Sequence, residues 1–454
     1  MSPATETLAL SSAPARGSLR EVWLLAYPVV VTQLSATLMG VIDSAMVGRL
    51  GPTELAAVGF GAIWIWTVFS LFYGTATGVQ TFVSQSDGAG RPERCGAWTW
   101  HAMWVLVPAS ALTVLALRPV VDGLLSLLGT SAELHNAASS YMHARLPGEV
   151  GFAVWMVVTS FFRGVRDTRS PMVVAICVNL LNAALDYGLI FGNFGLPAWG
   201  VSGAATATAI AQWTGALVLL GLLRRKRLQR YRTRPVAPNL ASARRFLRVG
   251  APIGGQWCVG VASFAVFTTI VARMGDDSMA ASQAFIMLLS LSFMQAIGLS
   301  VAAQTLVGRY KGARDPSAAR RSFTSSLGLA FMLAGGVALL FVAAPGPLLR
   351  IFTDDPEIVA LGRPLLFVGA VFQLCDAIAI ISQGALRGGG DTRWPFLVET
   401  ALGWFVFLPL AYGLGVSLGY GLTGAWIGGT VSLFFTATLL VRRFQHGPWE
   451  EMRI

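Results

Sequence analysis

Five acidic residues lie within apolar stretches of the chain, where a carboxylate needs a physical reason to be. They are Asp43, Asp186, Asp376, Glu399 and, less deeply, Glu149. An ionised carboxylate inside lipid costs at least about 2.5 kcal/mol, so acids in membrane spans usually face a water-filled cavity. A carboxylate in such a place can bind and release a cation, and these five residues are the first candidates for chemistry.

Asp43 and Asp186 form the stronger group because amides accompany them. Asn182 precedes Asp186 by one helical turn, so the two side chains share a helix face, with Asn179 on the same side. Carboxylate and amide oxygens are hard ligands that suit a proton or a sodium ion. Counted from the expected starts of their spans, at positions 22 and 170, both aspartates lie in the outer half of the membrane. The alternative is a hydrogen-bonded cluster that only braces helices.

A second polar group is predicted in the other half of the chain. Asp376 lies deep in a span, and Gln256, Gln283 and Gln373 are its candidate polar neighbours. The group could contact a cationic substrate, or Asp376 could simply be hydrogen-bonded to a glutamine. Glu399 lies near a predicted membrane surface, so we interpret it as a side chain that extends to that surface or as a gate residue.

Two further features concern helix geometry. Arg145 and Glu149 are one helical turn apart and are predicted to form an ion pair. Pro28 lies inside the first apolar stretch, where it removes a backbone hydrogen bond and permits a bend. Pro252 occupies the matching place in the second half, where Phe267 stands in place of an acid, and this match favours a static bend.

Composition sets the class of protein. The 454 residues are 54% hydrophobic and only 12% charged, whereas a soluble chain carries about a quarter charged residues. The sequence therefore predicts an all-α polytopic membrane protein. The net charge of +11 does not indicate nucleic acid binding, because the basic residues lie between apolar spans. The four cysteines show no pairing or metal-binding pattern and are interpreted as small apolar fillers: Cys95, Cys177, Cys258 and Cys375.

The positions of the acids depend on twelve predicted transmembrane helices. We expect them near residues 22–47, 53–80, 97–117, 138–162, 170–192, 200–223, 249–272, 279–306, 322–344, 361–386, 395–416 and 421–441. Of the 33 lysines and arginines, 27 lie in the two tails and in every second connection, which predicts that both termini are cytoplasmic. The resulting domains are a tail (1–21), a six-helix bundle (22–223), a basic linker (224–248), a second six-helix bundle (249–441) and a tail (442–454).

The two bundles are predicted to be repeats of each other. Pro28 and Pro252 are separated by an offset of 224 (252 − 28), and further motifs recur at the same offset. They are Arg49-x-Gly51 with Arg273-x-Gly275, Ala56-Ala57 with Ala280-Ala281, Gln80-Thr81 with Gln304-Thr305, Gly88-Ala89-x-x-Pro92 with Gly312-Ala313-x-x-Pro316, and Arg163-Gly164-x-x-Asp167-Thr168-Arg169 with Arg387-Gly388-x-x-Asp391-Thr392-Arg393. A constant offset indicates an internal duplication. Because each half has an even number of spans, the halves share one orientation, as in secondary transporters with parallel repeats.

These motifs resemble the multidrug and toxic compound extrusion (MATE) family from about residue 20 to residue 443. The resemblance rests on Pro28 with Asp43, on the repeated Gly-Ala and Arg-Gly-x-x-Asp-Thr-Arg motifs, and on Asn182-x-x-x-Asp186. It implies a cation site at Asp43, Asn182 and Asp186, joined by Thr206 or Thr208. It also implies that bending at Pro28 is linked to the state of Asp43. A second-half sodium site of the family would need an acid near Gly260, which this chain lacks.

The expected function is a secondary efflux antiporter, not an enzyme, that exports lipophilic or cationic compounds in exchange for protons or Na⁺. Alternating access would come from rocking of the two bundles, with no cofactor besides the coupling ion. The expected setting is the plasma (inner) membrane, with lipid around a monomer and a small organic cation as substrate. A flippase for lipid-linked precursors is the alternative. Four histidines without metal-binding spacing and the absence of a nucleotide-binding motif argue against an enzyme or an ATP-driven pump.

Overall fold

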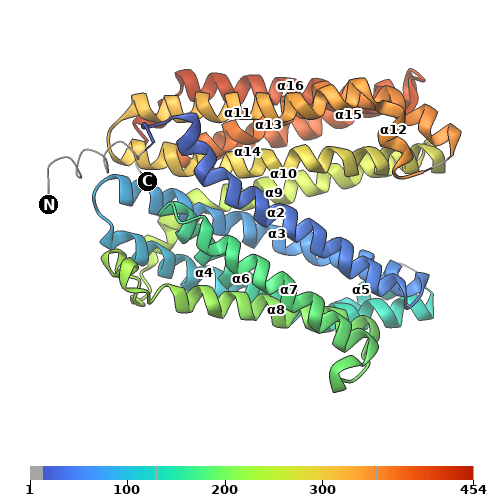
Figure 1. Cartoon of the computed structure of the whole chain (residues 1–454), viewed down its shortest axis with the longest axis horizontal. Helices are drawn as coiled ribbons and strands as arrows, with labels where there is room; N and C mark the ends of the chain where they lie inside the picture. Colours follow the sequence, from blue (N-terminus) through green and yellow to red (C-terminus); the bar gives the residue numbers. More distant parts are fainter. Residues whose placement is uncertain (1–13, 128–130, 354, 453) are drawn as a thin grey trace, which may run out of the picture.

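A computed structural model describes residues 14–127, 131–353, 355–452 and 454, and within these ranges the chain forms helices and no strands. The described part of the first half forms seven α-helices, shown from blue to green in Figure 1. They are α2 (Leu19–Gly48), α3 (Pro52–Gly88), α4 (Glu93–Leu117), α5 (Val121–Leu127), α6 (Ala132–Gly164), α7 (Arg169–Phe191) and α8 (Gly200–Leu222).

The second half repeats this order. Its helices are α9 (Leu240–Ala272), α10 (Asp276–Gly312), α11 (Pro316–Ala343), α12 (Pro345–Arg350), α13 (Pro356–Gly389), α14 (Arg393–Leu402), α15 (Leu408–Tyr412) and α16 (Gly421–His446). Two π-helical turns, Gly403–Phe407 and Gly413–Ser417, continue α14 and α15 into one apolar segment. The short helices α5 and α12 stand at equivalent places in the two halves and were not predicted.

Eleven described helical segments are long and apolar enough to cross a membrane. The twelfth predicted span corresponds to α6, which has 33 residues but carries the charged side chains Arg145, Glu149 and Arg163. It packs between α3 and α8 inside the first bundle, so protein rather than lipid surrounds those charges. The fold is thus the predicted one of twelve transmembrane helices in two bundles.

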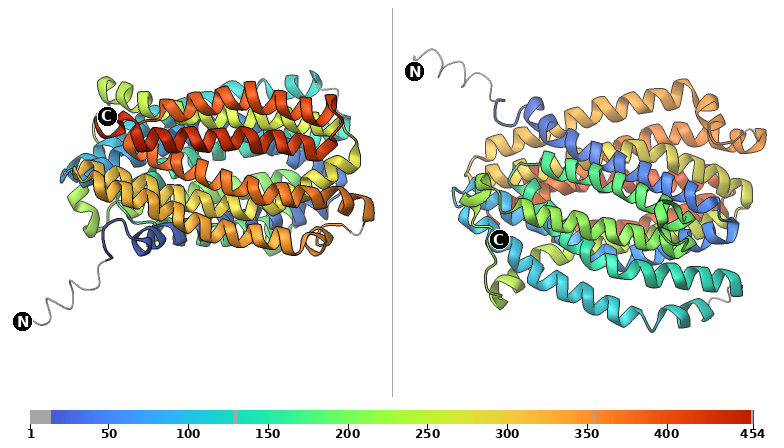
Figure 2. Two further views of the ribbon diagram at one scale, coloured as in Figure 1. Left: turned by 90° about the horizontal axis from the view of Figure 1, so that it is seen from above. Right: turned by 60° about the horizontal axis from the view of Figure 1, so that its bottom comes forward.

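The two bundles lie side by side, and the first helix of each crosses between them (Figures 1 and 2). Val22 and Leu25 of α2 lie in the apolar core of the second bundle, whereas Val47 packs against α7 and α8 of the first. In α9 the arrangement is reversed: Phe246 and Val249 lie in the core of the first bundle. These residues are repeat mates (246 − 22 = 249 − 25 = 224), so the crossing follows the duplication.

The start of α2 and the C-terminal residue lie at one end of the bundles (Figure 1), which we call the terminal end; the opposite end is the distal end. Several expected boundaries shift. The basic linker predicted at 224–248 is shorter, because α9 already begins at Leu240. The tail predicted from residue 442 begins as helix, since α16 continues to His446, and Trp449 then stacks on Phe444. Most of the predicted N-terminal tail (1–13) lies outside the described residues.

Candidate functional site

The predicted first-half site is assembled from α2 and α7, which pack side by side. The amide of Asn182 donates a hydrogen bond to Asp186 one turn further along α7, and both side chains are buried. The carboxyl group of Asp43 lies within hydrogen-bonding reach of that of Asp186. Two turns toward the terminal end, Asn179 Nδ2 donates to Ser35 Oγ at 2.8 Å. The structure therefore brings the three predicted residues together.

The bonding within this site leaves room for a cation. Asp43 Oδ1 and Asp186 Oδ1 are both buried, and neither has a hydrogen-bond partner among the described residues. Two carboxyl groups in contact cannot both be ionised at low cost, because like charges repel strongly where water is scarce. A proton between them, or a small cation against the free oxygens, removes that repulsion. Asp43 is only half-buried, so one side of the pair is open to exchange.

The threonines expected to join this site use their hydroxyl groups elsewhere. Thr206 Oγ1 donates to Ser202 O at 2.7 Å, and Thr208 Oγ1 donates to Ala204 O at 2.9 Å, both within α8. Each side chain is half-buried. No described hydrogen bond connects either hydroxyl to the aspartates, and the assignment of a threonine to the site stays a prediction.

Arg145 forms a polar network beside the aspartates, and the sequence predicted only its pair with Glu149. Arg145 Nη1 lies 2.6 Å from Glu149 Oε1, which confirms the predicted ion pair. The same nitrogen donates to Gln212 Oε1 of α8 at 2.7 Å, and the guanidinium is hydrogen-bonded to the Tyr141 hydroxyl. Its positive charge also acts on Asp43. The one-turn spacing revealed the pair, but the contacts with other helices depend on packing that spacing does not encode.

Of the residues predicted for the second-half polar group, Gln256 lies in a hydrogen-bonded cluster around Glu399. Gln256 Nε2 donates to Glu399, and its oxygen accepts from Arg387 Nη2 at 2.7 Å. Gln383 Nε2 also donates to Glu399, at 3.0 Å. Asp376 is within electrostatic range of Glu399. The interpretation that Glu399 extends to a membrane surface is wrong, because two amides and a nearby guanidinium hold it inside the bundle.

The remaining two glutamines do not join this cluster through hydrogen bonds. Gln373 is buried on α13, and neither atom of its amide group has a partner among the described residues. Gln283 is exposed on α10. Pro28 lies within a continuous α2, where its carbonyl oxygen accepts a hydrogen bond from Thr32 Oγ1 at 2.8 Å.

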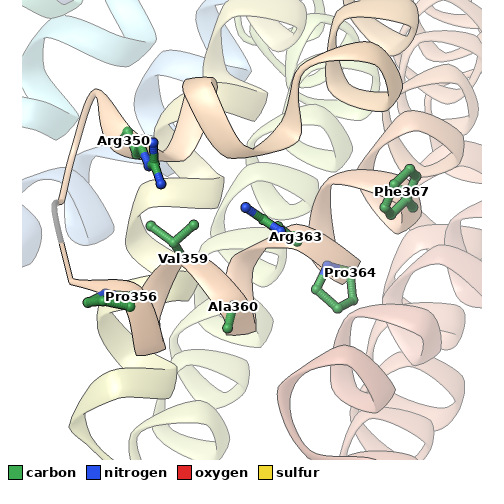
Figure 3. A pocket seen from close by; sticks show the side chains of 7 residues that line it. All are labelled: Arg350, Pro356, Val359, Ala360, Arg363, Pro364 and Phe367. Atoms are coloured by element: carbon green, nitrogen blue, oxygen red, sulfur yellow. The ribbon is translucent and has the colours of Figure 1, made fainter.

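A pocket of about 570 Å³ opens at the distal end of the second bundle (Figure 3). Its walls are apolar apart from Arg350 and Arg363, and it shares no residue with either polar group described above. Within the described parts of the chain, no three His, Cys, Asp or Glu side chains are grouped so as to hold a metal ion. All four cysteines are free; Cys95 and Cys375 are buried, as the interpretation as fillers expects, whereas Cys258 is half-buried and Cys177 is exposed.

Comparison with known proteins identifies the family. The MatE family profile matches residues 28–188 and 252–412, two segments whose starts differ by the same offset of 224 (252 − 28). The chain is 31% identical to "Probable multidrug resistance protein NorM" of Thermotoga maritima, over 96% of this chain and 94% of that protein. It is 30% identical to "Multidrug resistance protein MdtK" of Proteus mirabilis, over 93% of this chain and 94% of that protein.

Solved structures share the fold. The crystal structure of a MATE protein in the straight conformation superposes with a TM-score of 0.88 at 20% identity, covering 96% of this chain and 98% of that one. The eukaryotic MATE transporter AtDTX14 gives a TM-score of 0.83 at 22% identity, covering 95% and 96%. From the profile match and the relatives that span its length, the chain belongs to the multidrug and toxic compound extrusion (MATE) family of membrane transporters.

Proposed function

We propose that the protein exports small lipophilic or cationic compounds across the inner membrane in exchange for protons or Na⁺. The observation that carries this proposal is the contact between Asp43 and Asp186, with one buried oxygen on each carboxyl group left without a partner among the described residues. Relatives named as multidrug resistance proteins support the substrate class. The excess of basic residues in alternate connections supports cytoplasmic termini.

The site couples ion and substrate through charge. When the coupling ion leaves, the aspartate pair keeps a negative charge that lipid-facing helices tolerate only at a cost of at least about 2.5 kcal/mol. An organic cation entering between the bundles offsets that charge, and the returning proton or Na⁺ offsets it in the substrate's place. Ion and substrate thus exclude each other, and their exchange accompanies rocking of the bundles between an opening at the distal end and one at the terminal end.

The test is dye efflux in inverted membrane vesicles with an imposed pH gradient or an imposed sodium gradient. Collapse of transport by only one ionophore identifies the ion. Asp43→Asn should abolish gradient-driven efflux at normal expression, because an amide cannot release a proton or hold a cation by charge. Asp277→Asn is the matched control, since Asp277 is an exposed acid at the start of α10. Full activity of Asp43→Asn would rule out this coupling site.

A further inference from the structure

The repeated Gln-Thr motifs of the sequence meet each other across the boundary between the bundles. The amide of Gln80 in α3 reaches α10, where Nε2 donates to Val301 O at 2.9 Å and to Thr305 Oγ1 at 2.8 Å. The repeat mate of Gln80 makes the reverse contacts. Gln304 Nε2 donates to Thr77 O at 3.3 Å and to Thr81 Oγ1 at 3.2 Å. The acceptors are repeat mates as well (301 − 77 = 305 − 81 = 224), so the two sets of hydrogen bonds are related by an approximate two-fold axis.

Each threonine that accepts from an amide also donates onward. Thr81 Oγ1 donates to Arg387 O of α13 at 2.9 Å. Thr305 Oγ1 shares its proton between Arg163 O of α6 and Val301 O of its own helix, each at 3.1 Å. The two carbonyl groups belong to the repeated Arg-Gly motifs (387 − 163 = 224). On each side of the axis, a chain of hydrogen bonds from an amide through a hydroxyl to a backbone carbonyl therefore connects three helices. The residues of this chain come from the repeated Gln-Thr and Arg-Gly motifs of the sequence.

The backbones of α3 and α10 approach closely beside these bonds. A Cβ atom on Gly308 would lie 3.2 Å from Cβ of its repeat mate Ser84, which places the two-fold axis between them. One turn further, Gly88 abuts the carbonyl oxygen of Arg309, and its mate Gly312 abuts that of Gln85. Repeated glycines thus provide the close approach that lets both amides reach their acceptors.

The four polar side chains are almost fully buried: Gln80 is 1% exposed, Gln304 3%, Thr81 0% and Thr305 1%. They are all neutral. Each neutral hydrogen bond contributes only about 0.5–1.5 kcal/mol net, because an amide released into water recovers most of its hydrogen bonding, whereas separating a buried ion pair costs more. These bonds therefore suit a contact that must form and break repeatedly.

The bonds are confined to one end of the molecule. Arg309 Nη1 pairs with Asp87 Oδ2 at 2.6 Å, and Tyr310 donates to Glu21, both on the terminal side of the glutamines. Toward the distal end, only long sulfur contacts at Gln33 and Cys258 (3.8 and 3.9 Å) join the bundles by hydrogen bonding among the described residues. The bundles are thus fastened at the terminal end and free of such fastening at the distal end.

We propose that Gln80 and Gln304 are paired gate residues: together they latch the terminal end shut and release when the transporter opens there. This proposal rests on the proposed function, in which the two bundles rock. The symmetry gives it a specific consequence. Each glutamine makes two bonds to the opposite bundle, so removal of either amide should favour opening to a similar extent.

The test measures opening directly, by pulsed electron paramagnetic resonance in nanodiscs on a cysteine-free background. Spin labels replace Arg94 of the first bundle and Ser317 of the second, both exposed at the terminal end. Gln80→Ala and Gln304→Ala, which add little apolar surface that would favour closure, should each raise the ratio of long to short label distances by about tenfold, as expected for two lost hydrogen bonds. Ser326→Ala is the control, because this buried hydroxyl bonds only to Ser322 O within its own helix, and it should leave the ratio unchanged.

Equal shifts in the two alanine variants support the latch; unchanged distances in both, or a shift in only one, overturn it. Gln80→Asn and Gln304→Asn keep an amide but shorten its reach, and they carry the same test if an alanine variant does not fold. Because the distances are measured without substrate or ion gradient, the result separates the latch from the proposed transport. Efflux that is absent from wild-type vesicles would refute the transport proposal while leaving the distance measurement intact.

Discussion

Gly88→Ala probes the contact between α3 and α10 at the terminal end. A Cβ atom at position 88 would lie 1.9 Å from the carbonyl oxygen of Arg309 and 2.7 Å from its carbonyl carbon. Since Cβ atoms essentially never approach other heavy atoms within 3.0 Å, the two helices must separate by about 1 Å to admit the methyl group. Both contacting atoms belong to the backbone, so no side-chain rotation can relieve the overlap.

The cost follows from the size of the overlap. Overpacking of a well-packed contact costs about 1–3 kcal/mol, which corresponds to a shift of about 5- to 150-fold in favour of the open terminal end. Gly312→Ala should act similarly, because its Cβ atom would lie 2.2 Å from Gln85 O. Gly335→Ala is the matched control: this glycine lies inside α11, with no atom within 4 Å of the added methyl group. Its helix should be slightly stabilised.

The assay follows a cysteine at position 84, which is fully buried between the bundles in the closed arrangement. In an otherwise cysteine-free protein, the rate at which Ser84→Cys reacts with a membrane-impermeant maleimide reports how often the terminal end opens. Gly88→Ala should raise that rate by at least about fivefold, and Gly335→Ala should not change it. Equal rates in the two variants would show that the close backbone contact does not control opening.

Three further outcomes are expected. Ser84→Cys with Gly308→Cys should form a disulfide on oxidation: their Cβ atoms would lie 3.2 Å apart, and a separation of the helices by a few tenths of an ångström gives the Cβ–Cβ distance of about 3.5–4.5 Å that a disulfide spans. Efflux should then stop until a reductant is added, and efflux by the cross-linked protein would contradict rocking. Arg145→Gln should lower the free energy of unfolding by about 3–5 kcal/mol by leaving Glu149 buried without its partner, a loss that Glu149→Gln should largely restore, as denaturant titration can check. The hydroxyl group of Ser139 in α6 donates to Asp122 at 2.5 Å and lowers the pKa of this exposed carboxyl group. The hydrogen-bonded carboxylate therefore contributes to stability above about pH 3.9, and this contribution is lost as the pH falls through the pKa in the folded protein. Asp122→Asn should remove that part of the acid sensitivity of the melting temperature, and identical pH profiles would count against it.

The sequence was informative wherever the signal is periodic or repeated. Apolar length predicted the spans, and the constant offset between the motifs predicted two equivalent halves, which the separate family matches confirm. The span predicted at 138–162 holds as α6 despite its charges, and Arg145 and Glu149 pair with each other inside the bundle. Helix ends were misjudged, since the arginines after Leu240 occupy the solvent-facing turns of a helix and not a linker.

The candidate site was predictable only in part. One helical turn separates Asn182 from Asp186, and that spacing alone places them together. Contacts between helices were beyond reach: neither the approach of Arg145 to Asp43 nor the position of Glu399 inside the bundle follows from local pattern. Gln80 and Gln304 were visible as a repeat, but the repeat does not say that the two copies touch. That contact depends on where the axis between the halves runs.

The crossing of α2 and α9 has a consequence for how the protein is made. Val22 and Leu25 find their apolar neighbours among helices that leave the ribosome only after the whole first half, beginning with α10. Until then the first turns of α2 have only lipid or chaperones to cover them. The first half therefore cannot finish folding by itself, and synthesis of the second half should be the step that allows both halves to fold. Co-expressed as two separate polypeptides, the halves should protect each other from proteolysis, and neither should survive alone.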